Sequence, residues 1–446
     1  MKKLLAAVLA LTMLLLCACS GAQAPTKSGA DAPAKDSSAA PGEGEQTIQF
    51  LHQWSDEKRG PFFQGIVDGY MAQNPNVKIE VEAVANAPYK EKLRVMLGSN
   101  DVPDVFFTWD GDWLSKYARA GALLDISSYL QADSAWRDSF TPIFLQAGQV
   151  GDKQYGLPIR VCSDLVCYNK DIFAQYSLGV PKTWDDFEKI CDTLLQNGIV
   201  PYAAGNAEGN DISHIVALTN IQLVPENIFN DDYTLVTGAF DDPGYVKGIE
   251  LLVSFKEKGY FNEGFASTSQ DLAREMFAAG QSAMVRENCA NIKANILEKM
   301  DPEKLGVFAF PKFADAPGAN DVVVAWIDQF VVSSQTDVAN ASVDFLKYFY
   351  KEENQQEMTR TCGFISPIAS VNSNAELSYD QLNEAIEIIN GAGSLTSTLD
   401  LELDAAVADV YLTGLQEIFT ESSQRTPADI MAQVHEEAQR VIAESK

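Results

Sequence analysis

Aromatic, acidic and amide residues gather at three places where an expected strand gives way to a loop. The three stretches are Gln53-Trp54-Ser55-Asp56, Trp109-Asp110 and Arg286-Glu287-Asn288. An indole face can stack against the C–H face of a ring, and charged or amide groups form paired hydrogen bonds with hydroxyls. Open α/β sheets bind ligands outside the carboxyl ends of their strands. The sequence therefore predicts that these loops are candidate ligand-binding positions.

Several of these aromatic residues also have a purely structural interpretation. Trp54 serves equally well as a core residue, and Trp184, on a capped helix, suits packing better than binding. Trp109 is expected to contact ligand, because the Gly111 and acids beside it suit a cleft loop better than a core. Asn86, in the loop after the second expected strand, is a further candidate.

Motifs for catalysis and for metal binding are absent from the sequence. There is no G-x-S-x-G, H-E-x-x-H, P-loop, G-x-G-x-x-G or CxxC, and the chain has 3 histidines in all. We therefore expect a protein that is not an enzyme and that has neither cofactor nor metal. A glycosidase needs two carboxylates at a defined separation, which the sequence alone leaves open.

Composition limits the partners and the domain organisation. The formal net charge of -29 argues against nucleic acid and against anionic lipid, since no basic stripe is present. A 46% hydrophobic content is normal for a globular protein, and the length suggests about two or three domains. After residue 19 the sequence has an odd number of cysteines, which we expect to be free and buried: Cys162, Cys167, Cys191, Cys289 and Cys362. In a strand, Cys162 and Cys167 would face opposite sides.

Residues 1–46 indicate the cellular location of the protein. Lys2 and Lys3 precede the apolar run Leu4–Leu16, which is too short to span a bilayer, as in a secretory signal. The run ends in Leu-Cys-Ala-Cys, which resembles the lipobox of bacterial lipoproteins. That resemblance implies a signal peptide over 1–18 and lipidation of Cys19, with Cys17 or an ordinary cleaved signal as alternatives.

The residues that follow Cys19 predict a tether. Ser20–Gln46 has almost no large apolar side chain and cannot offset the entropy of ordering. We expect a flexible segment over 19–46 with a reach of about 30 Å. No further long apolar run follows the signal.

Alternating strand-like and helix-like segments predict an open α/β sheet. Strands are expected at Thr47–Leu51, Lys78–Val84, Asp104–Thr108, Asp164–Tyr168, Ser282–Val285, Gly306–Phe310 and Val322–Val332. Helices are expected at Phe62–Met71, Lys90–Leu97, Thr183–Asn197, Phe240–Lys258, Asp337–Tyr350 and from Thr426 onward.

Four stretches in a particular order carry a resemblance to a known family. They are Asn74–Val81, Pro103–Trp109, Tyr155–Phe173 and Val180–Phe187. Their order and spacing resemble the family 1 extracellular solute-binding proteins of ABC importers, over nearly all of Thr47–Lys446. Asn197–Pro201 and Ala204–Asn206 are similar to the multiple-sugar and raffinose-type branch.

The resemblance implies a type II periplasmic-binding-protein-like fold, in which two α/β lobes close over a cleft about a hinge. Lobe 1 would comprise residues 47–160 and 329–366, and lobe 2 residues 161–328 and 367–446. It also implies a sugar or short oligosaccharide as ligand, an ABC permease as partner, and a monomer that contacts the membrane only through its lipid. The alternatives are a polyamine or peptide binder, a lipoprotein glycosidase, and a sensor that presents ligand to a histidine kinase.

The resemblance further places residues in the cleft and at the hinge. Asn206 and His214 fall where sugar-binding relatives have cleft residues, and Trp326 with Asp328 falls at a hinge crossing. Arg160 is either a ligand donor or a hinge ion-pair partner. The sequence departs from the family in lacking an aromatic residue shortly after Arg286-Glu287-Asn288 and a tryptophan within Leu399–Leu403. A short or polar glycan is therefore favoured over a long maltodextrin-like one.

Overall fold

The computed structural model describes residues 45–99, 102–207, 209–319, 321–420 and 422–444. The predicted signal peptide, the predicted lipidation of Cys19 and nearly all of the predicted tether lie outside these residues. Within the described ranges, no helix combines the length and the apolar character needed to cross a bilayer.

Nine of the described strands form one mixed sheet in the order β2-β1-β3-β10-β6-β8-β7, with β11 beside β10 and β9 beside β6. The strands are β1 Gln46–His52, β2 Val77–Ala83, β3 Val105–Thr108, β6 Gly156–Asn169, β7 Val200–Ala203, β8 Ser282–Asn288, β9 Leu305–Phe308, β10 Val322–Val332 and β11 Ser394–Thr396. β4 Gln149–Val150 and β5 Lys153–Gln154 form a separate hairpin. β1 is parallel to β2 and β3, and β10 is antiparallel to β3 and β6.

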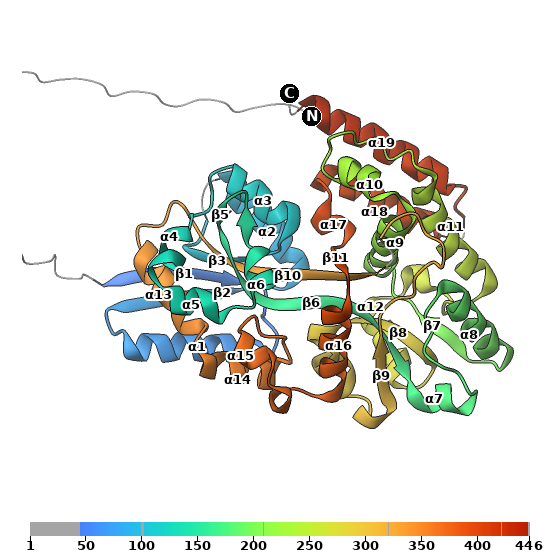
Figure 1. Cartoon of the computed structure of the whole chain (residues 1–446), viewed down its shortest axis with the longest axis horizontal. Helices are drawn as coiled ribbons and strands as arrows, with labels where there is room; N and C mark the ends of the chain where they lie inside the picture. The colour runs from blue at the N-terminus through green and yellow to red at the C-terminus, as the bar shows by residue number, and fades with distance from the viewer. Residues whose placement is uncertain (1–44, 100–101, 208, 320, 421, 445–446) are drawn as a thin grey trace, which may run out of the picture. The chain divides into compact units, whose positions relative to one another are not determined.

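The two long strands β6 and β10 run through the middle of the sheet and contribute residues to more than one hydrophobic core (Figure 1). Residues 156–163 of β6 pair with β10, whereas residues 164–169 pair with β8 and β9. The carboxyl half of β10 pairs with β3, and its amino half pairs with β11. A third segment joins β6 midway, where Val161 forms an isolated bridge with Ile365. The two halves of the sheet are therefore connected by a few central residues.

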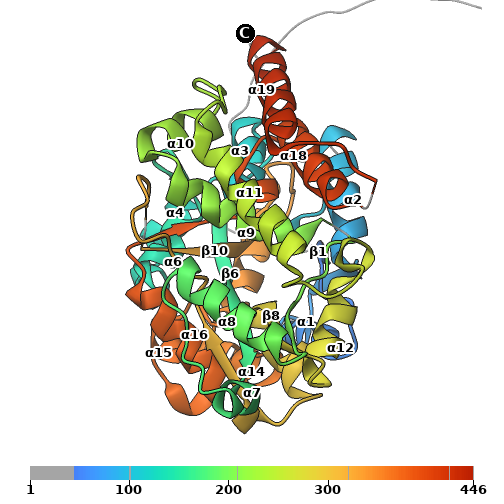
Figure 2. The ribbon, with the colours of Figure 1, turned by 90° about the vertical axis from the view of Figure 1, so that its right-hand side faces the viewer.

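The first core forms around β1, β2 and β3, and it is rich in aromatic residues. Trp54 stacks on Phe63 with ring centroids 4.2 Å apart, and Phe63 stacks in turn on Phe349. α1 and α14 lie on one side of the sheet, and α2 and α3 lie on the other (Figures 1 and 2). The helices of this half are α1 Gly60–Gln73, α2 Asn86–Ser99, α3 Gly111–Arg119, α4 Ser127–Ala132, α5 Ser134–Ser139, α6 Pro142–Gln146, α13 Ala339–Phe349, α14 Glu352–Cys362 and α15 Ala369–Asn372.

The second core lies beyond the crossing strands, and a third cluster surrounds β8 and β9. In the second core, α9, α11, α18 and α19 pack together (Figure 2). The helices of this half are α7 Lys170–Gln175, α8 Trp184–Gln196, α9 Asn210–Leu223, α10 Glu226–Tyr233, α11 Pro243–Lys258, α12 Gln270–Ala278, α16 Asp380–Gly391, α17 Leu399–Glu402, α18 Ala405–Ile418 and α19 Pro427–Glu444. Short turns η2 Cys289–Asn291 and η3 Lys293–Leu297 follow β8.

Local sequence signals explain most of these boundaries. The expected strand Val322–Val332 is confirmed, and the Thr183 hydroxyl accepts the Asp186 amide at the start of α8, as expected. The helix expected from Phe240 begins later, at Pro243. The Asp242 side chain caps it, accepting the Gly244 amide at 2.7 Å, while Phe240 has a positive φ that no helix tolerates.

The cysteine prediction is confirmed for the described residues. All five cysteines are free and buried. Cys162 packs in the first core and Cys167 in the cluster around β8 and β9, as expected from their odd spacing in one strand.

Candidate functional site

A cavity of about 420 Å³ opens where the loop after β3 meets β8, α9 and α17. Its lining contains Asn86, Lys90, Trp109, His214, Arg274, Arg286, Glu287, Asn288, Asn291, Trp326, Thr398, Asp400 and Leu401. The structure thus brings together many of the residues that the sequence singles out. These are Asn86, Trp109, His214, Arg286, Glu287, Asn288 and Trp326. A volume of this size suits a small ligand.

Trp109 forms an aromatic part of the wall and directly follows the buried strand β3. Its ring packs edge-on against Phe107, with centroids 4.8 Å apart, and against Trp113 at 5.1 Å. The Lys90 ammonium lies 5.0 Å from the Trp109 ring centroid. Only 4% of Trp109 is exposed in this conformation, so the residue is both a cavity wall and part of the first core.

Helix α17 reaches across to α2 and α3 and completes the wall. The Asp400 carboxylate pairs with Lys90 of α2, and the Asp400 carbonyl accepts the Trp113 indole N–H at 3.2 Å. Burial alone would raise the pKa of Asp400, but the Lys90 ammonium holds that pKa below its ordinary range. The contact depends on Gly111, whose φ is 64° and whose missing Cβ would lie 2.6 Å from the Leu401 carbonyl oxygen.

A buried ionic network forms another part of the wall. Arg286 of β8 donates to Asp164 of β6 at 2.8 Å and also pairs with Asp211 of α9. Asp164 in turn pairs with His214, whose ring meets the Trp326 ring edge-on at 6.0 Å. Burial would raise the pKa of Asp164, but His214 and Arg286 outweigh it and lower that pKa to about 2. The network fixes the orientation of both Arg286 and His214.

A second ion pair flanks this network at the end of β8. Arg274 of α12 makes two hydrogen bonds to the Glu287 carboxylate, at 2.6 and 3.2 Å. The Asn288 side chain accepts the Ala290 amide and turns the chain into η2. At the edge of the cavity, Arg59 donates to the Asn291 side chain at 2.8 Å, which links the start of α1 to η2.

Charge is compensated throughout this lining. Lys90 pairs with Asp400, Arg274 with Glu287, and Arg286 with Asp164 and Asp211. The remaining polar groups are amides, a threonine and His214. The cavity therefore offers many hydrogen-bond donors and acceptors and two indole rings, and each of these charged side chains has a partner of opposite charge. This chemistry suits a neutral ligand that carries hydroxyl groups.

Other residues singled out from the sequence lie outside this cavity. Trp54 is 2% exposed within the first core, and its neighbours Gln53 and Ser55 are half-buried and exposed. Asp56 pairs with Arg59 at 2.8 Å and so helps to orient the Arg59 side chain, which donates to Asn291 at the edge of the cavity.

Arg160 and Asp328 form a buried ion pair at 2.7 Å where β6 and β10 cross between the cores. The Arg160 guanidinium also lies 4.3 Å from the Phe364 ring centroid. Of the two roles considered for Arg160, this geometry is that of an ion-pair partner. Asn206 is 1% exposed after β7, and its side-chain amide has no hydrogen-bond partner among the described residues. Asp110 lines a different cavity.

Sequence reasoning missed six of the lining residues: Lys90, Arg274, Asn291, Thr398, Asp400 and Leu401. Lys90 and Arg274 lie on helices, where their surroundings were not predicted. Residues 399–403 were noted only for lacking a tryptophan. The sequence does contain a signal for Asp400, because an acidic residue follows Thr398-Leu399 at the start of a helix. Acidic residues near helix starts are too common in this acidic chain for that signal to single out Asp400.

Comparison with known proteins decides the family. The sequence profile of the bacterial extracellular solute-binding proteins matches residues 54–356. This chain belongs to that family. The solute-binding protein is 22% identical over 376 residues to the multiple sugar-binding protein of Streptococcus mutans, covering 81% of each chain. It is 22% identical over 407 residues to the melibiose/raffinose/stachyose-binding protein MelE of Bacillus subtilis, covering 87% of each.

Solved structures share the fold of the solute-binding protein. A chitin oligosaccharide binding protein superposes with a TM-score of 0.80 at 22% identity, covering 90% of this chain and 100% of the other. The predicted two-lobe α/β fold class is thereby confirmed, as is the resemblance to extracellular solute-binding proteins. Family membership also confirms the expectation that the protein binds a solute and is not an enzyme. In the described residues, no group of three or more His, Cys, Asp or Glu is placed to hold a metal ion.

Proposed function

We propose that the protein captures a sugar or short oligosaccharide in the cavity around Trp109 and Trp326 and delivers it to an ABC permease. The observation that carries this proposal is the charge-compensated lining, in which each charged side chain already has an opposite partner. Transfer of a charged ligand into such a site would leave its charge unmatched. The sugar-binding names of the relatives from Streptococcus mutans and Bacillus subtilis support the same ligand class.

Closure of two lobes about the crossing strands is the proposed mechanism. We place lobe 1 at residues 47–160 and 329–366, and lobe 2 at 161–328 and 367–446. With this division the cavity is lined from both lobes, by Trp109 on one side and by His214 and Asp400 on the other. A ligand that touches both lobes only when they are closed shifts the equilibrium toward that state. The closed form would then dock on the permease as a monomer.

The proposed location is the outer face of the cell membrane. Membership of an extracellular family supports a place outside the cytoplasm. We further propose that residues 1–18 are removed, that Cys19 carries the lipid, and that residues 19–46 tether the lobes. The membrane is contacted through this lipid alone, and the high negative charge favours neither nucleic acid nor anionic lipid as a partner.

Titration calorimetry against a ligand panel tests the proposed function. The panel contains neutral mono- to tetrasaccharides, acidic sugars, short peptides, and the polyamines putrescine and spermidine. We expect at least one neutral saccharide to bind tightly, and Trp326→Leu to weaken that binding, because the variant removes an indole that lines the cavity. Tight binding of a polyamine or peptide with no saccharide would contradict the proposal.

A second measurement separates a receptor from a glycosidase. Glu287 and Asp400 are the two carboxylates among the described lining residues. Glu287 forms an ion pair with Arg274, and Asp400 forms one with Lys90. Asp400 is a poor proton donor because the Lys90 ammonium outweighs burial and lowers its pKa, and the Glu287 carboxylate is occupied by two hydrogen bonds from Arg274, so we expect no hydrolysis. Prolonged incubation with the best-binding oligosaccharide should release no new reducing ends, and turnover would overturn the receptor proposal.

A further inference from the structure

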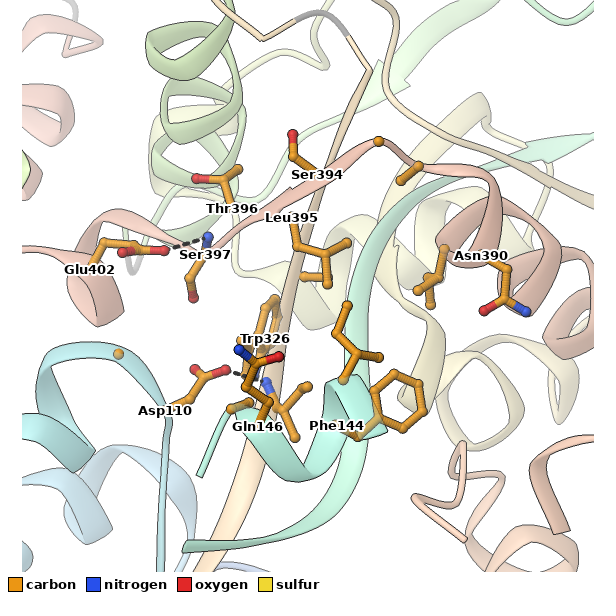
Figure 3. Close-up of a pocket in the computed structure, with 18 residues that line it drawn as sticks. Asp110, Phe144, Gln146, Trp326, Asn390, Ser394, Leu395, Thr396, Ser397 and Glu402 are labelled. Carbon is orange, nitrogen blue, oxygen red and sulfur yellow. Dashed lines mark hydrogen bonds between the residues drawn. The ribbon is translucent and has the colours of Figure 1, made fainter. Parts of the chain in front are cut away.

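A second cavity, of about 500 Å³, shares Trp326 with the first but is otherwise lined by other residues. It lies between the start of α3, helix α6, the crossing strand β10 and the segment that runs from the end of α16 through β11 to α17 (Figure 3). Its lining includes Asp110, Phe144, Trp326, Leu395, Ser397 and Glu402.

One end of this cavity is acidic. Asp110, Ser397 and Glu402 lie at the same end in Figure 3, with the Ser397 side chain directed toward Asp110. One oxygen of Asp110 accepts the Ile327 amide at 2.7 Å, and one oxygen of Glu402 accepts the Ser397 amide at 2.9 Å. The backbone thus holds both carboxyl groups at the cavity.

Two further polar atoms at this end lack partners in the described part of the chain. Asp110 Oδ1 and Ser397 Oγ are both shielded from solvent and make no hydrogen bond there. Ser397 is only 5% exposed. An unpartnered buried oxygen costs free energy unless a ligand or water satisfies it. These oxygens are therefore acceptors available to a bound molecule.

The lining has acids but no base, which sets this cavity apart from the first. Among the described residues that line it there is no Lys, Arg or His, and the Asp328 carboxylate nearby is already paired with Arg160. Burial, and then the neighbouring Glu402 and Asp328, raise the pKa of Asp110 against the lowering effect of the Ile327 amide, and burial raises the pKa of Glu402. Both shifts are those of carboxyl groups that lack a cation.

The side of the cavity away from the two acids is largely apolar. Phe144 of α6 lies on that side in Figure 3, together with the Asn390 amide, and Ile389 and Leu395 add aliphatic surface to the lining. A molecule that fills this space needs a cationic hydrogen-bond donor at one end and an apolar body at the other.

We propose that this second cavity binds an organic ammonium ion with an apolar body. The ammonium donates to Asp110 Oδ1, to Ser397 Oγ and to the Glu402 carboxylate, while the apolar part packs against Phe144 and Leu395. This site is separate from the saccharide cavity, whose charged side chains are paired, whereas neither Asp110 nor Glu402 forms an ion pair with a described residue.

Calorimetry at pH 8 and low salt, with three probes that share a phenylethyl body and differ in the polar group at its end, tests the proposal. The probes are phenethylammonium, the neutral 2-phenylethanol and the anionic 3-phenylpropionate. We expect the cation to bind at least tenfold more tightly than either of the others. Glu402→Gln, which keeps the acceptor for the Ser397 amide, and Ser397→Ala should each weaken the cation at least threefold. Asp68→Asn, an exposed acid on α1, removes the same charge and should leave binding unchanged.

Several outcomes would overturn the proposal. These are equal binding of the alcohol, no saturable binding of the cation, or equal affinity in Glu402→Gln, Ser397→Ala and the unmodified protein, with melting curves that confirm folding. Trp109→Ala separates this proposal from the saccharide proposal, because Trp109 lines only the first cavity. Ammonium binding should survive that variant whether or not any saccharide binds.

Discussion

Replacing Gly111 by alanine should selectively destabilise the closed arrangement of the two lobes. Gly111 has a φ of 64°, and a Cβ there would sit 2.6 Å from the Leu401 carbonyl oxygen of α17. The left-handed conformation costs an alanine roughly 1–2 kcal/mol in any state in which the loop is folded. The clash with Leu401 is different, because it exists only while α17 packs on α3. Overpacking of this kind costs about 1–3 kcal/mol.

The clash between the alanine Cβ and the Leu401 carbonyl therefore predicts a loss of saccharide affinity. The strain of the left-handed backbone predicts a loss of folding stability. Because 1.4 kcal/mol is a factor of ten, we expect saccharide binding to weaken roughly 5- to 150-fold in Gly111→Ala. Gly121→Ala is the matched control, since Gly121 has a φ of 72° just after the same helix and no atom of a described residue lies within 4 Å of its Cβ position. Both variants should melt at a lower temperature, and only Gly111→Ala should lose affinity.

Calorimetry with the best saccharide from the panel measures the affinity, and small-angle scattering measures compaction on ligand addition. The Gly111→Ala protein should need more saccharide to reach the compact state. If both glycine variants bind as tightly as the unmodified protein, α17 does not have to approach α3 for binding. If both lose affinity equally, backbone strain and not the Leu401 contact is responsible.

Three further predictions concern Trp109, Cys19 and Glu402. Trp109→Ala should weaken saccharide binding by the stacking contribution of about 0.5–1.5 kcal/mol plus lost contact area, and circular dichroism should show a folded, less stable protein; loss of the fold would mean that Trp109 serves only the core. Cys19→Ser should leave saccharide affinity unchanged and move the protein from the membrane fraction to the medium on fractionation; a protein that stays with the membrane contradicts lipidation at Cys19. Glu402 has a raised pKa in the folded state, so its protonated form stabilises the fold below the unfolded pKa and that stability is lost as pH rises through the folded pKa. Glu402→Gln should therefore raise the melting temperature at pH 8 and leave it unchanged at pH 4, and an equal effect at both pH values would exclude this cause.

The fold was predictable because its signals are local. Alternation and short apolar runs mark β2 and β3, and the Thr183 cap marks α8 without knowledge of any tertiary contact. The late start of α11 was missed because an apolar residue, Phe240, continues the periodic pattern while its backbone does not. Periodicity reports which side chains are buried, and it says less about where a helix begins.

The candidate site was predictable where it follows strand ends. Trp109 and Arg286-Glu287-Asn288 were found because they lie at or after the ends of β3 and β8. Lys90 and Asp400 were missed because they meet across 310 positions of sequence, a pairing that depends on how α17 packs. Trp54 has the same local signature as Trp109 and both pack in the first core, but Trp54 stacks on Phe63, whereas Trp109 also lines the cavity. Tertiary packing, and not residue type, separates the two tryptophans.

The burial of the five described cysteines makes the protein convenient to label at an introduced thiol. Burial raises the pKa of every one of their thiols, to about 12 for Cys289 and Cys362, so that maleimide reagents meet almost no thiolate. A single cysteine introduced at the exposed position Glu298, whose carboxylate pairs with Lys58 beside α1, would then be the reactive one in a protein that begins after residue 19. A fluorophore attached there would respond to the approach of the two halves, and the protein would become an optical reporter of its own ligand without removal of any native sulfur.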